Sequence, residues 1–369
     1  MGIHIVKREN CPLWKKAALY AAAILAALVI GGIILLAIGV NPIAYYTRMF
    51  TLGTAGNKIA YKTYVNYLKD FVPLVLTSLA LSLAFKMRFW NIGGEGQFIM
   101  GAIGASTVAL TLGSSLPSIL VLILMCLAAM LLAGLYGLMV AALKVKFGTN
   151  ETLLTLMLNY VALYLLTFLL ETKAPWNFFL QADANRPVPE KFPDSAMFPS
   201  LLKIGKFELN ICVVFVFIIG ALIYVYLKKT KQGYEINVVG DSANTARYAG
   251  MKVNKIVLRT VFLSACLIGL AAAFKMGTVG TLSTSITNDV GWTAIIVTWL
   301  SQLNTWAIFA VSALINVLHF GSSIAATTFK QVDSSFANML QGFILFLVLA
   351  ADFMIRFKFV RTKKEDNNG

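Results

Sequence analysis

The segment 91–97, with the sequence Asn-Ile-Gly-Gly-Glu-Gly-Gln, lies between two apolar runs and holds the first candidates for a binding site. Its three glycines break a helix here, because glycine loses the most conformational freedom on becoming helical. The run that begins at Gln97 then starts a new helix, and Glu95 suits the positive end of that helix. Interrupted helices in transporters line substrate sites with their free backbone groups. Asn91, Glu95 and Gln97 are therefore candidates for a substrate pathway, and the alternative is a surface turn in which Glu95 caps the helix.

The stretch 241–250 is a second candidate, and its sequence predicts one short capped helix. Asp241 or Ser242 can accept hydrogen bonds from the first free N–H groups, and Gly250 fits the left-handed residue that follows the last turn. A helix of about 12 Å is too short to be stable alone in water, so it must lie against something. It either rests on lipid at the interface or docks into a groove of another subunit. The candidate contact residues are Asp241, Ser242, Asn244, Arg247, Tyr248 and Gly250.

Two further positions stand out in apolar sequence. Asn159 lies about two turns inside the run that follows Glu151, and a buried amide must find a partner. Hydrogen bonding to another helix is the commoner reason for such an amide, and contact with a substrate is the other. Trp292 stands near the start of another apolar run. It fits either the aromatic belt of a membrane interface or a pathway for a nucleobase or a sugar.

The composition decides the class of protein. Of the 369 residues, 59% are hydrophobic and 13% are charged, whereas soluble domains are about 45–50% apolar and about 25% charged. A globule of this size could not bury so much apolar surface, so a soluble enzyme is excluded and a membrane protein with several spans is indicated. The net charge of +15 would suggest nucleic acid in a soluble protein. Here it fits cations that flank membrane spans and face membrane lipid, and no nucleic-acid partner is expected.

The predicted fold class is all-α, a polytopic membrane protein with about ten transmembrane helices, because about 20 apolar residues cross the hydrocarbon core. The uncharged runs are Ala17–Val40, Phe71–Phe85, Gln97–Gly113, Ile119–Leu143, Thr152–Leu170, Leu209–Leu227, Thr260–Phe274, Val290–Phe329 and Ser334–Ala351. Phe71–Phe85 and Thr260–Phe274 are short for a crossing, so we expect short, tilted or broken helices there. Val290–Phe329 is long enough for two spans with a tight turn near Gln302–Asn304.

The chain is predicted to form a single transmembrane domain over residues 1–369. Lysines and arginines concentrate on the cytoplasmic side of membrane proteins. Placing the N-terminus in the cytoplasm puts most of them inside. The N-terminal segment 1–16, the loop 228–259 and the tail 358–369 are then cytoplasmic, in a multi-pass protein of the cell membrane with both termini inside. The reversed orientation is the alternative.

Several kinds of chemistry are not indicated. The sequence lacks the G-x-x-x-x-G-K-[ST] motif that cradles ATP phosphates. Its four cysteines form no C-x-x-C pair, and His4 and His319 are far apart, so neither a metal site nor a cofactor is predicted. No pair of acids lies deep in an apolar run, where ion coupling often uses them. We therefore expect no catalytic residues in this chain.

Four blocks in order along the chain carry a family pattern. Residues 91–101 match N-I-G-x-E-G-Q-x-x-x-G, and residues 150–160 match N-E-x-x-x-T-x-M-L-N-Y. Residues 239–251 are similar to x-G-x-N-x-x-A-A-R-Y-A-G-I, and residues 291–302 are similar to G-x-x-A-I-A-V-A-L-L-G. Together the blocks resemble the permease subunits of sugar and nucleoside ABC importers, in the ribose and branched-chain amino acid permease superfamily. Trp299 departs from the pattern and leaves the substrate open.

The resemblance implies partners and a role for the segment 241–250. The chain would work with an ABC ATPase subunit, a second permease subunit, identical or homologous, and an extracytoplasmic substrate-binding lipoprotein. The short helix would be the coupling helix, seated in a groove of the ATPase, with Arg247 foremost. ATP hydrolysis belongs to that partner, so the chain itself is not expected to be an enzyme. The outer loop Thr172–Lys206 is a candidate dock for the binding protein, or a packed lid over the helices.

The resemblance and the residues together predict nucleoside uptake by ATP-driven alternating access, with simple sugars as the alternative substrate. The expected pathway residues are Asn91, Glu95, Gln97, Asn159 and Trp292. An ion-coupled secondary transporter of nucleobases is the alternative mechanism, and it would need no ATPase partner.

Overall fold

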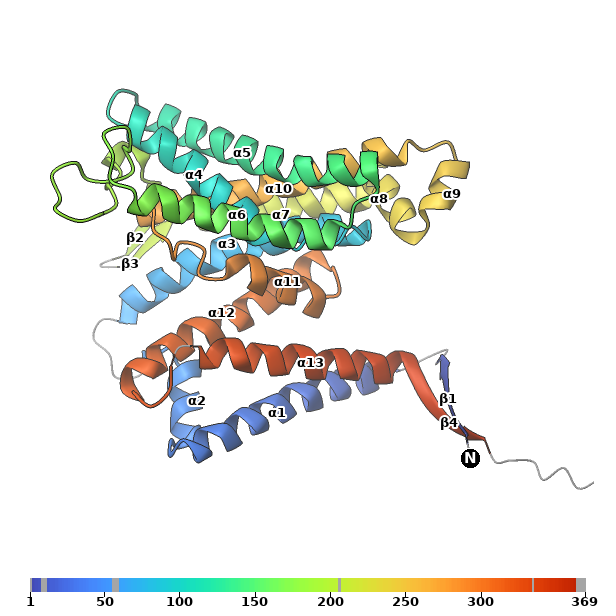
Figure 1. Ribbon diagram of the computed structural model, residues 1–369. Helices are drawn as coiled ribbons and strands as arrows, with labels where there is room; N and C mark the ends of the chain where they lie inside the picture. Colours follow the sequence, from blue (N-terminus) through green and yellow to red (C-terminus); the bar gives the residue numbers. More distant parts are fainter. Residues whose placement is uncertain (1, 8–11, 55–59, 205–206, 334, 363–369) are drawn as a thin grey trace, which may run out of the picture. The chain divides into compact units, whose positions relative to one another are not determined.

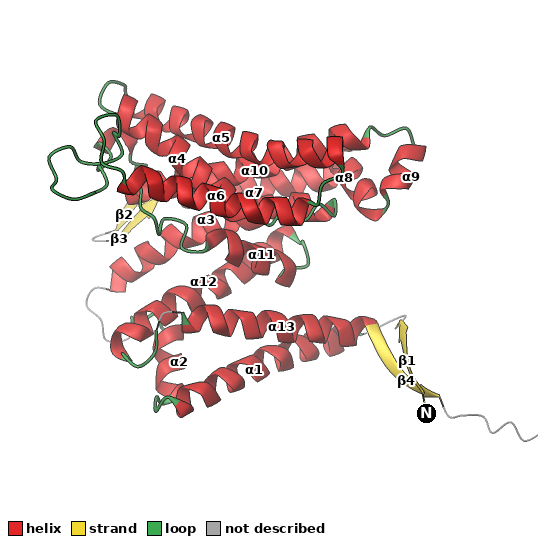
Figure 2. Cartoon of the chain, in the orientation of Figure 1, coloured by secondary structure: helices red, strands yellow, loops and turns green. Residues whose placement is uncertain are grey.

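The computed structural model describes residues 2–7, 12–54, 60–204, 207–333 and 335–362, and most of them are helical (Figure 2). By its internal contacts the chain divides into two compact units, one of residues 1–58 with 317–369 and one of residues 59–316. All the candidate pathway and coupling residues lie in the second, larger unit. The single-domain organisation stays a prediction.

The smaller unit is a set of helices with a two-stranded ribbon. Its elements are β1 (Gly2–Lys7), α1 (Leu13–Ala37), α2 (Pro42–Phe50), α13 (Phe336–Arg356) and β4 (Phe357–Thr362), with the last turns of α12. Helix α1 packs against α13, and β1 pairs with β4 in antiparallel register (Figure 1). The buried Tyr45 ties α2 to its neighbours, because its hydroxyl lies 2.6 Å from that of Ser322 and its ring packs edge-on against Phe336. Residues 363–369 of the predicted tail lie outside the described residues.

The larger unit is built around α10, which packs against α3, α4 and α5 (Figure 1). Its helices are α3 (Ala60–Lys86), α4 (Gly94–Leu112), α5 (Ser118–Phe147), α6 (Glu151–Glu171), α7 (Cys212–Lys229), α8 (Lys231–Asp241), α9 (Ala243–Tyr248), α10 (Val253–Val279), α11 (Val290–Leu300) and the first half of α12 (Thr305–Thr328). The long connection from α6 to α7 holds a 3-10 turn (Asp194–Ala196) and the hairpin of β2 (Ser200–Ile204) and β3 (Phe207–Asn210).

The predicted all-α, polytopic membrane fold is confirmed. Among the described residues, eight helices are long and apolar enough to cross a membrane, namely α1, α3, α5, α6, α7, α10, α12 and α13. Helix α4 has 19 residues, or about 28 Å, and is buried along most of its length. Helix α11 is apolar as well, but its 11 residues are too few to count as a membrane span.

Two helices are longer than the sequence predicts. Phe71–Phe85 and Thr260–Phe274 are not short or broken helices but parts of α3 and α10, each of which is continuous over 27 residues. The prediction of short or broken helices is wrong because charged residues near the helix ends find partners within the protein, and a tilt stays a prediction. Lys275 on α10 forms an ion pair with Asp70 on α3. A charge that ends an uncharged run therefore does not end the helix.

The run Val290–Phe329 turns where predicted but does not form two full spans. Residues 301–304 reverse the chain, with Gln302 and Leu303 at left-handed φ values of 50° and 59°. Helix α12 then has 24 residues, whereas α11 is only about 16 Å long and cannot cross a hydrocarbon core of about 30 Å.

Glycines bring α4 close to both of its neighbours. A Cβ atom on Gly101 would lie 2.7 Å from the Cα atom of Gly269 on α10. One on Gly104 would lie 2.9 Å from the carbonyl oxygen of Ala128 on α5. Small residues let helix backbones approach in this way in membrane proteins. These crossings place the first turn of α4, which carries Glu95, at a fixed depth in the bundle.

Candidate functional site

The segment between α3 and α4 is held by two side-chain amides that bind each other. Asn91 Nδ2 donates to Gln97 Oε1 over 3.1 Å, and Gln97 Nε2 donates to Asn91 Oδ1 over 3.1 Å. The same Asn91 oxygen accepts from the backbone N–H of Gly93 at 3.1 Å. Both amides are buried, and a buried amide is stable only with partners. The pair therefore sets the course of the chain into α4.

Helix α6 binds this segment through the side chain of Asn159. Its Nδ2 donates to the carbonyl oxygen of Ile92 over 3.0 Å, and its Oδ1 accepts from the backbone N–H of Gly96 at 2.8 Å. A Cβ atom on Gly96 would lie 2.9 Å from that Oδ1 atom, so glycine admits the contact. The structure thus gives the buried amide partners within the protein. A contact with substrate stays a prediction.

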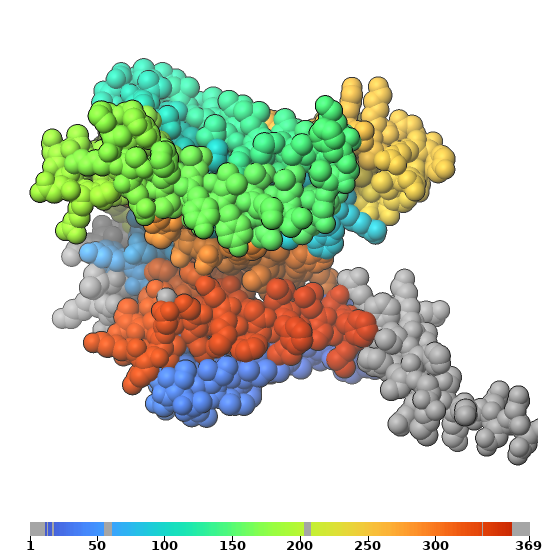
Figure 3. Space-filling model, viewed as in Figure 1, coloured from blue at the N-terminus to red at the C-terminus, as the bar shows by residue number. Residues whose placement is uncertain are grey.

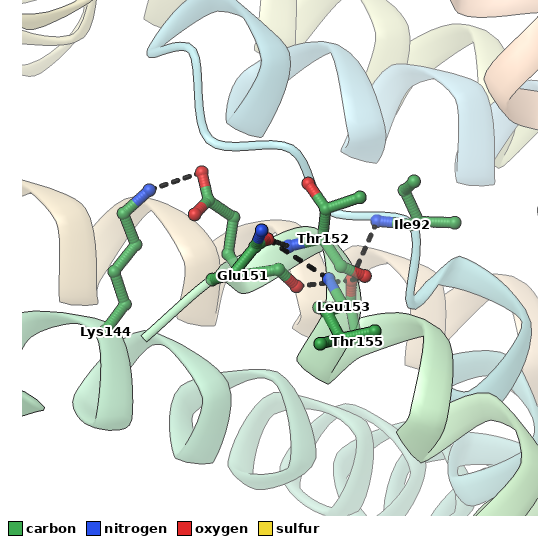
Figure 4. A network of polar contacts seen from close by, with 7 residues as sticks. Ile92, Lys144, Glu151, Thr152, Leu153 and Thr155 are labelled. Atoms are coloured by element: carbon green, nitrogen blue, oxygen red, sulfur yellow. Dashed lines mark hydrogen bonds and ion pairs between the residues drawn. The ribbon is translucent and has the colours of Figure 1, made fainter. Parts of the chain in front are cut away.

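The start of α6 has its own polar contacts (Figure 4). Asn150 caps the helix, because its Oδ1 accepts from two backbone N–H groups at 3.0 and 3.2 Å. Glu151 forms an ion pair with Lys144 near the end of α5. One turn further on, the Thr155 hydroxyl accepts from the backbone N–H of Ile92 at 3.2 Å. Helix α6 is therefore attached both to α5 and to the segment before α4.

Glu95 joins the first turn of α4 to the first turn of α11. Its Oε2 accepts from the backbone N–H of Gly291 at 2.8 Å. A Cβ atom on Gly291 would collide with the backbone nitrogen of Glu95. Free N–H groups and the helix dipole favour a negative charge at a helix start. Glu95 is therefore a cap, as one interpretation of the sequence held, but it caps α11.

The two helix starts meet well inside the bundle. Asn159, which bonds the first turn of α4, lies eight positions after Glu151, or about 12 Å along α6. A Cβ atom on Gly94 would lie 3.6 Å from the Cα atom of Gly291. Interrupted helices with converging N-termini are the arrangement in which transporters bind substrates. Among the described residues, no group of three or more His, Cys, Asp and Glu side chains could hold a metal ion.

The predicted coupling segment 241–250 is divided between two helices. Asp241 is the last residue of α8, so of the two predicted caps it is Ser242, and not Asp241, that starts the short helix α9. The turn comes at Ser242, whose hydroxyl accepts from the backbone N–H of Thr245 at 3.2 Å and caps α9. Gly250 has a φ of +75°, as expected for a residue after a helix. The predicted loop 228–259 is thus largely helical.

Helix α9 lies at one end of the larger unit (Figure 3), and its polar side chains are exposed. Tyr248 is 93% exposed, and Arg247 and Asn244 are exposed beside it. Ala246 is buried and holds the helix to the body of the unit. The surface is therefore available for a partner on one side and anchored on the other.

Two contacts tie α8 to the membrane helices. Arg259 Nη2 on α10 lies 2.9 Å from Glu235 Oε2, and both side chains are partly shielded from solvent. A Cβ atom on Gly240 would collide with the carbonyl oxygen of Lys86, the last residue of α3. Beside them, a cavity of about 560 Å³ separates α9 from the ends of α3, α5 and α10. Helix α8 is therefore fixed to α3 and α10, while α9 stands partly free.

The structure brings four of the five predicted pathway residues into one polar cluster, and the fifth is an exposed aromatic residue next to it. The clustered residues are Asn91, Glu95, Gln97 and Asn159. Trp292 is 38% exposed on α11 beside them. Their roles in transport stay predictions.

Four residues that make contacts between helices in the structure were not predicted from the sequence. Gly291 is the first residue of the fourth family block, and a glycine at that position could have indicated a close contact between backbones. Glu235 and Arg259 belong to a basic segment with no motif, and Trp90 precedes Asn91 without a pattern of its own. Their partners are distant in sequence, so no local signal identifies them.

A family model described as branched-chain amino acid transport system / permease component matches residues 63–349. The glucose ABC transporter permease protein TsgB13 of Haloferax volcanii is 28% identical over 95% of this chain and 92% of that protein. The nucleoside ABC transporter permease protein NupB of Lactococcus lactis subsp. cremoris is 27% identical over 92% of each chain. The guanosine ABC transporter permease protein NupP of Bacillus subtilis is 26% identical over 94% of this chain and 96% of that protein. No solved structure matches the chain significantly.

Replacing Asn159 with leucine should destabilise the protein. The change leaves the N–H of Gly96 and the carbonyl of Ile92 unpaired, at a cost of about 1–3 kcal/mol for each buried group. We expect a clear fall in the thermal midpoint of the purified protein. Tyr160→Leu is the matched control, because Tyr160 is the exposed neighbour on the same helix. Equal midpoints for the two variants would contradict the assignment.

Proposed function

Because this chain belongs to the family of branched-chain amino acid transport system permease components, we propose that it is the permease subunit of an ABC importer that carries nucleosides. The similarity to the nucleoside and guanosine permeases over 92% and 94% of the chain carries this proposal. Simple sugars are the second candidate, because the glucose permease is similar over 95% of the chain. Trp292 beside the Glu95 junction suits a substrate with a flat ring.

The proposed assembly contains a separate ABC ATPase, a second permease subunit and an extracytoplasmic binding lipoprotein. Both termini and α9 face the cytoplasm in this proposal, and the ATPase binds the outward side of α9, formed by Asn244, Arg247 and Tyr248. The binding protein docks on the opposite side, where the connection 172–206 exposes Trp176 and Phe178. Within that connection, residues 205–206 lie outside the described residues.

The contacts of α8 support a route for coupling. A displacement of α9 would be passed to α10 through the Glu235–Arg259 ion pair and to α3 through the contact at Gly240. Helix α3 continues into the segment that carries Asn91, and α10 packs against α4. Both routes end at the two helix starts around Glu95. ATP binding and substrate binding would then bias one conformational equilibrium, as coupling between sites requires.

The function is tested by uptake in cells that express the complete transporter and lack other nucleoside carriers. We expect labelled guanosine to enter, with uptake that stops when ATP is depleted and persists with a protonophore. Uptake of glucose in place of guanosine would favour the sugar candidate. Uptake that the protonophore abolishes while ATP remains would contradict an ATP-driven importer.

Replacing Arg247 with glutamate should uncouple the transporter. The charge reversal changes the exposed side of α9 without removing a buried contact. We expect uptake to fall about tenfold or more, which corresponds to about 1.4 kcal/mol, while the binding protein keeps its affinity for substrate. Lys229→Glu, at an exposed position at the end of α7, is the charge-matched control. Normal uptake by the Arg247 variant would remove α9 from the coupling route.

Exchanging the charges of Glu235 and Arg259 tests whether the ion pair between α8 and α10 passes on the displacement of α9. Each single reversal, Glu235→Arg or Arg259→Glu, places two like charges at the contact and should reduce ATP-dependent uptake. The double variant restores an ion pair, so we expect it to recover much of the uptake. The ratio of uptake to ATP hydrolysis separates loss of coupling from loss of protein. Additive losses in the double variant would show that the pair does not transmit motion.

A further inference from the structure

Three aromatic rings form a cluster at the end of α11. The indole of Trp299 stacks on that of Trp90, with ring centroids 5.2 Å apart and planes at 17°. Phe85 on α3 completes the cluster, at 5.7 Å from Trp299 and 5.9 Å from Trp90. Phe85 is buried, whereas Trp90 is 44% exposed. The inner ring thus fixes the cluster, and Trp90 presents a large aromatic surface outward.

The cluster and Trp292 lie along one side of α11. Trp292 and Trp299 are seven positions apart, which is about two helical turns, so their side chains share a face. The two positions are separated by about 10 Å along the axis. Trp292 follows Gly291, whose N–H bonds Glu95. The aromatic face of α11 therefore runs from the polar junction inside the bundle to the turn at residues 301–304.

A belt at one membrane level accounts for Trp90 and Trp299, which lie close to Lys86 and Arg88 at the end of α3, but not for Trp292. Belt tryptophans sit at the level of the lipid headgroups. Trp292 instead follows Gly291, whose N–H bonds Glu95, and Trp299 lies about 10 Å further along α11. Indoles at two depths on one face fit a path along which a flat molecule moves better than an anchor at one membrane level.

The chemistry of stacked rings identifies what such a face binds. Aromatic rings prefer offset stacking with centroids about 4.5–7 Å apart, which is the geometry that Trp90 and Trp299 already adopt. Every nucleobase has a π-face that can stack in the same way, whereas a sugar has none. From the Trp90 surface and its place below Trp292, we propose that Trp90 and Trp299 form a second stacking station for the nucleobase. The inference rests on the proposed function and adds the residues that hold the base.

Two substitutions at Trp90 test the stacking station. Trp90→Leu removes the π-face and keeps an apolar side chain, whereas Trp90→Phe keeps an aromatic ring. Uptake of each nucleoside that the wild-type transporter carries is measured below saturation, together with ATP hydrolysis stimulated by the loaded binding protein. We expect Trp90→Leu to lower uptake about fivefold or more, as for the loss of one base-stacking contact, and Trp90→Phe to retain most of it.

The matched control is the same pair of substitutions at Trp306 on α12. Trp306 is 49% exposed and also packs against a phenylalanine, Phe309, so its removal reports the general cost of losing an exposed indole. We expect no difference between the leucine and phenylalanine variants there. Equal uptake by Trp90→Leu and Trp90→Phe, or the same difference at Trp306, would overturn the stacking station while nucleoside transport itself stands. A wild-type transporter that takes up glucose and no nucleoside would overturn the proposed function, and the inference with it.

Discussion

A buried carboxylate between two helix starts is the interaction on which the larger unit depends. Glu95 lies in the first turn of α4 and accepts from the N–H of Gly291, 196 positions further along the chain. A carboxylate is costly to take out of water unless it is paired or hydrogen-bonded. The N–H of Gly291 at the start of α11 supplies such a bond, and the helix dipole adds to it. Helix α11 can therefore begin inside the bundle, where an uncapped start would be unstable.

The side chains around Glu95 satisfy the backbone that an interrupted helix leaves unpaired. Backbone N–H and carbonyl groups have no water to bond in the core of a membrane. Asn159 takes two of them, the N–H of Gly96 and the carbonyl of Ile92, and Asn91 takes the N–H of Gly93. The glycines of this segment stand at the start of α4, and they leave room for the side chains that bond its first turn.

Features set by neighbouring residues could be predicted from the sequence, and contacts between distant segments could not. A break before α4 and a helix start near Glu151 follow from residue types a few positions apart, although α4 begins at Gly94, three residues before the predicted Gln97. Nothing local places Gly291 beside Glu95, so the carboxylate could be assigned to a cap or a pathway but not to α11. The lengths of α3 and α10 were underestimated because Lys275 and Asp70 neutralise each other only in the folded chain. Where two helices follow each other directly, as at residues 241–243, their cap residues cannot be assigned to one helix or the other from sequence alone.

The number of buried bonds between helices limits how the larger unit can change shape. The Thr298 hydroxyl on α11 donates to the carbonyl of Ser78 over 3.0 Å, and the Ser264 hydroxyl on α10 donates to the carbonyl of Ala80 over 2.7 Å. With the Glu95 junction, these bonds connect α3, α4, α10 and α11 into one body. Bending within that body would leave several buried groups unpaired, at about 1–3 kcal/mol each. In the proposed importer, alternating access would therefore move this body as one piece against the second subunit.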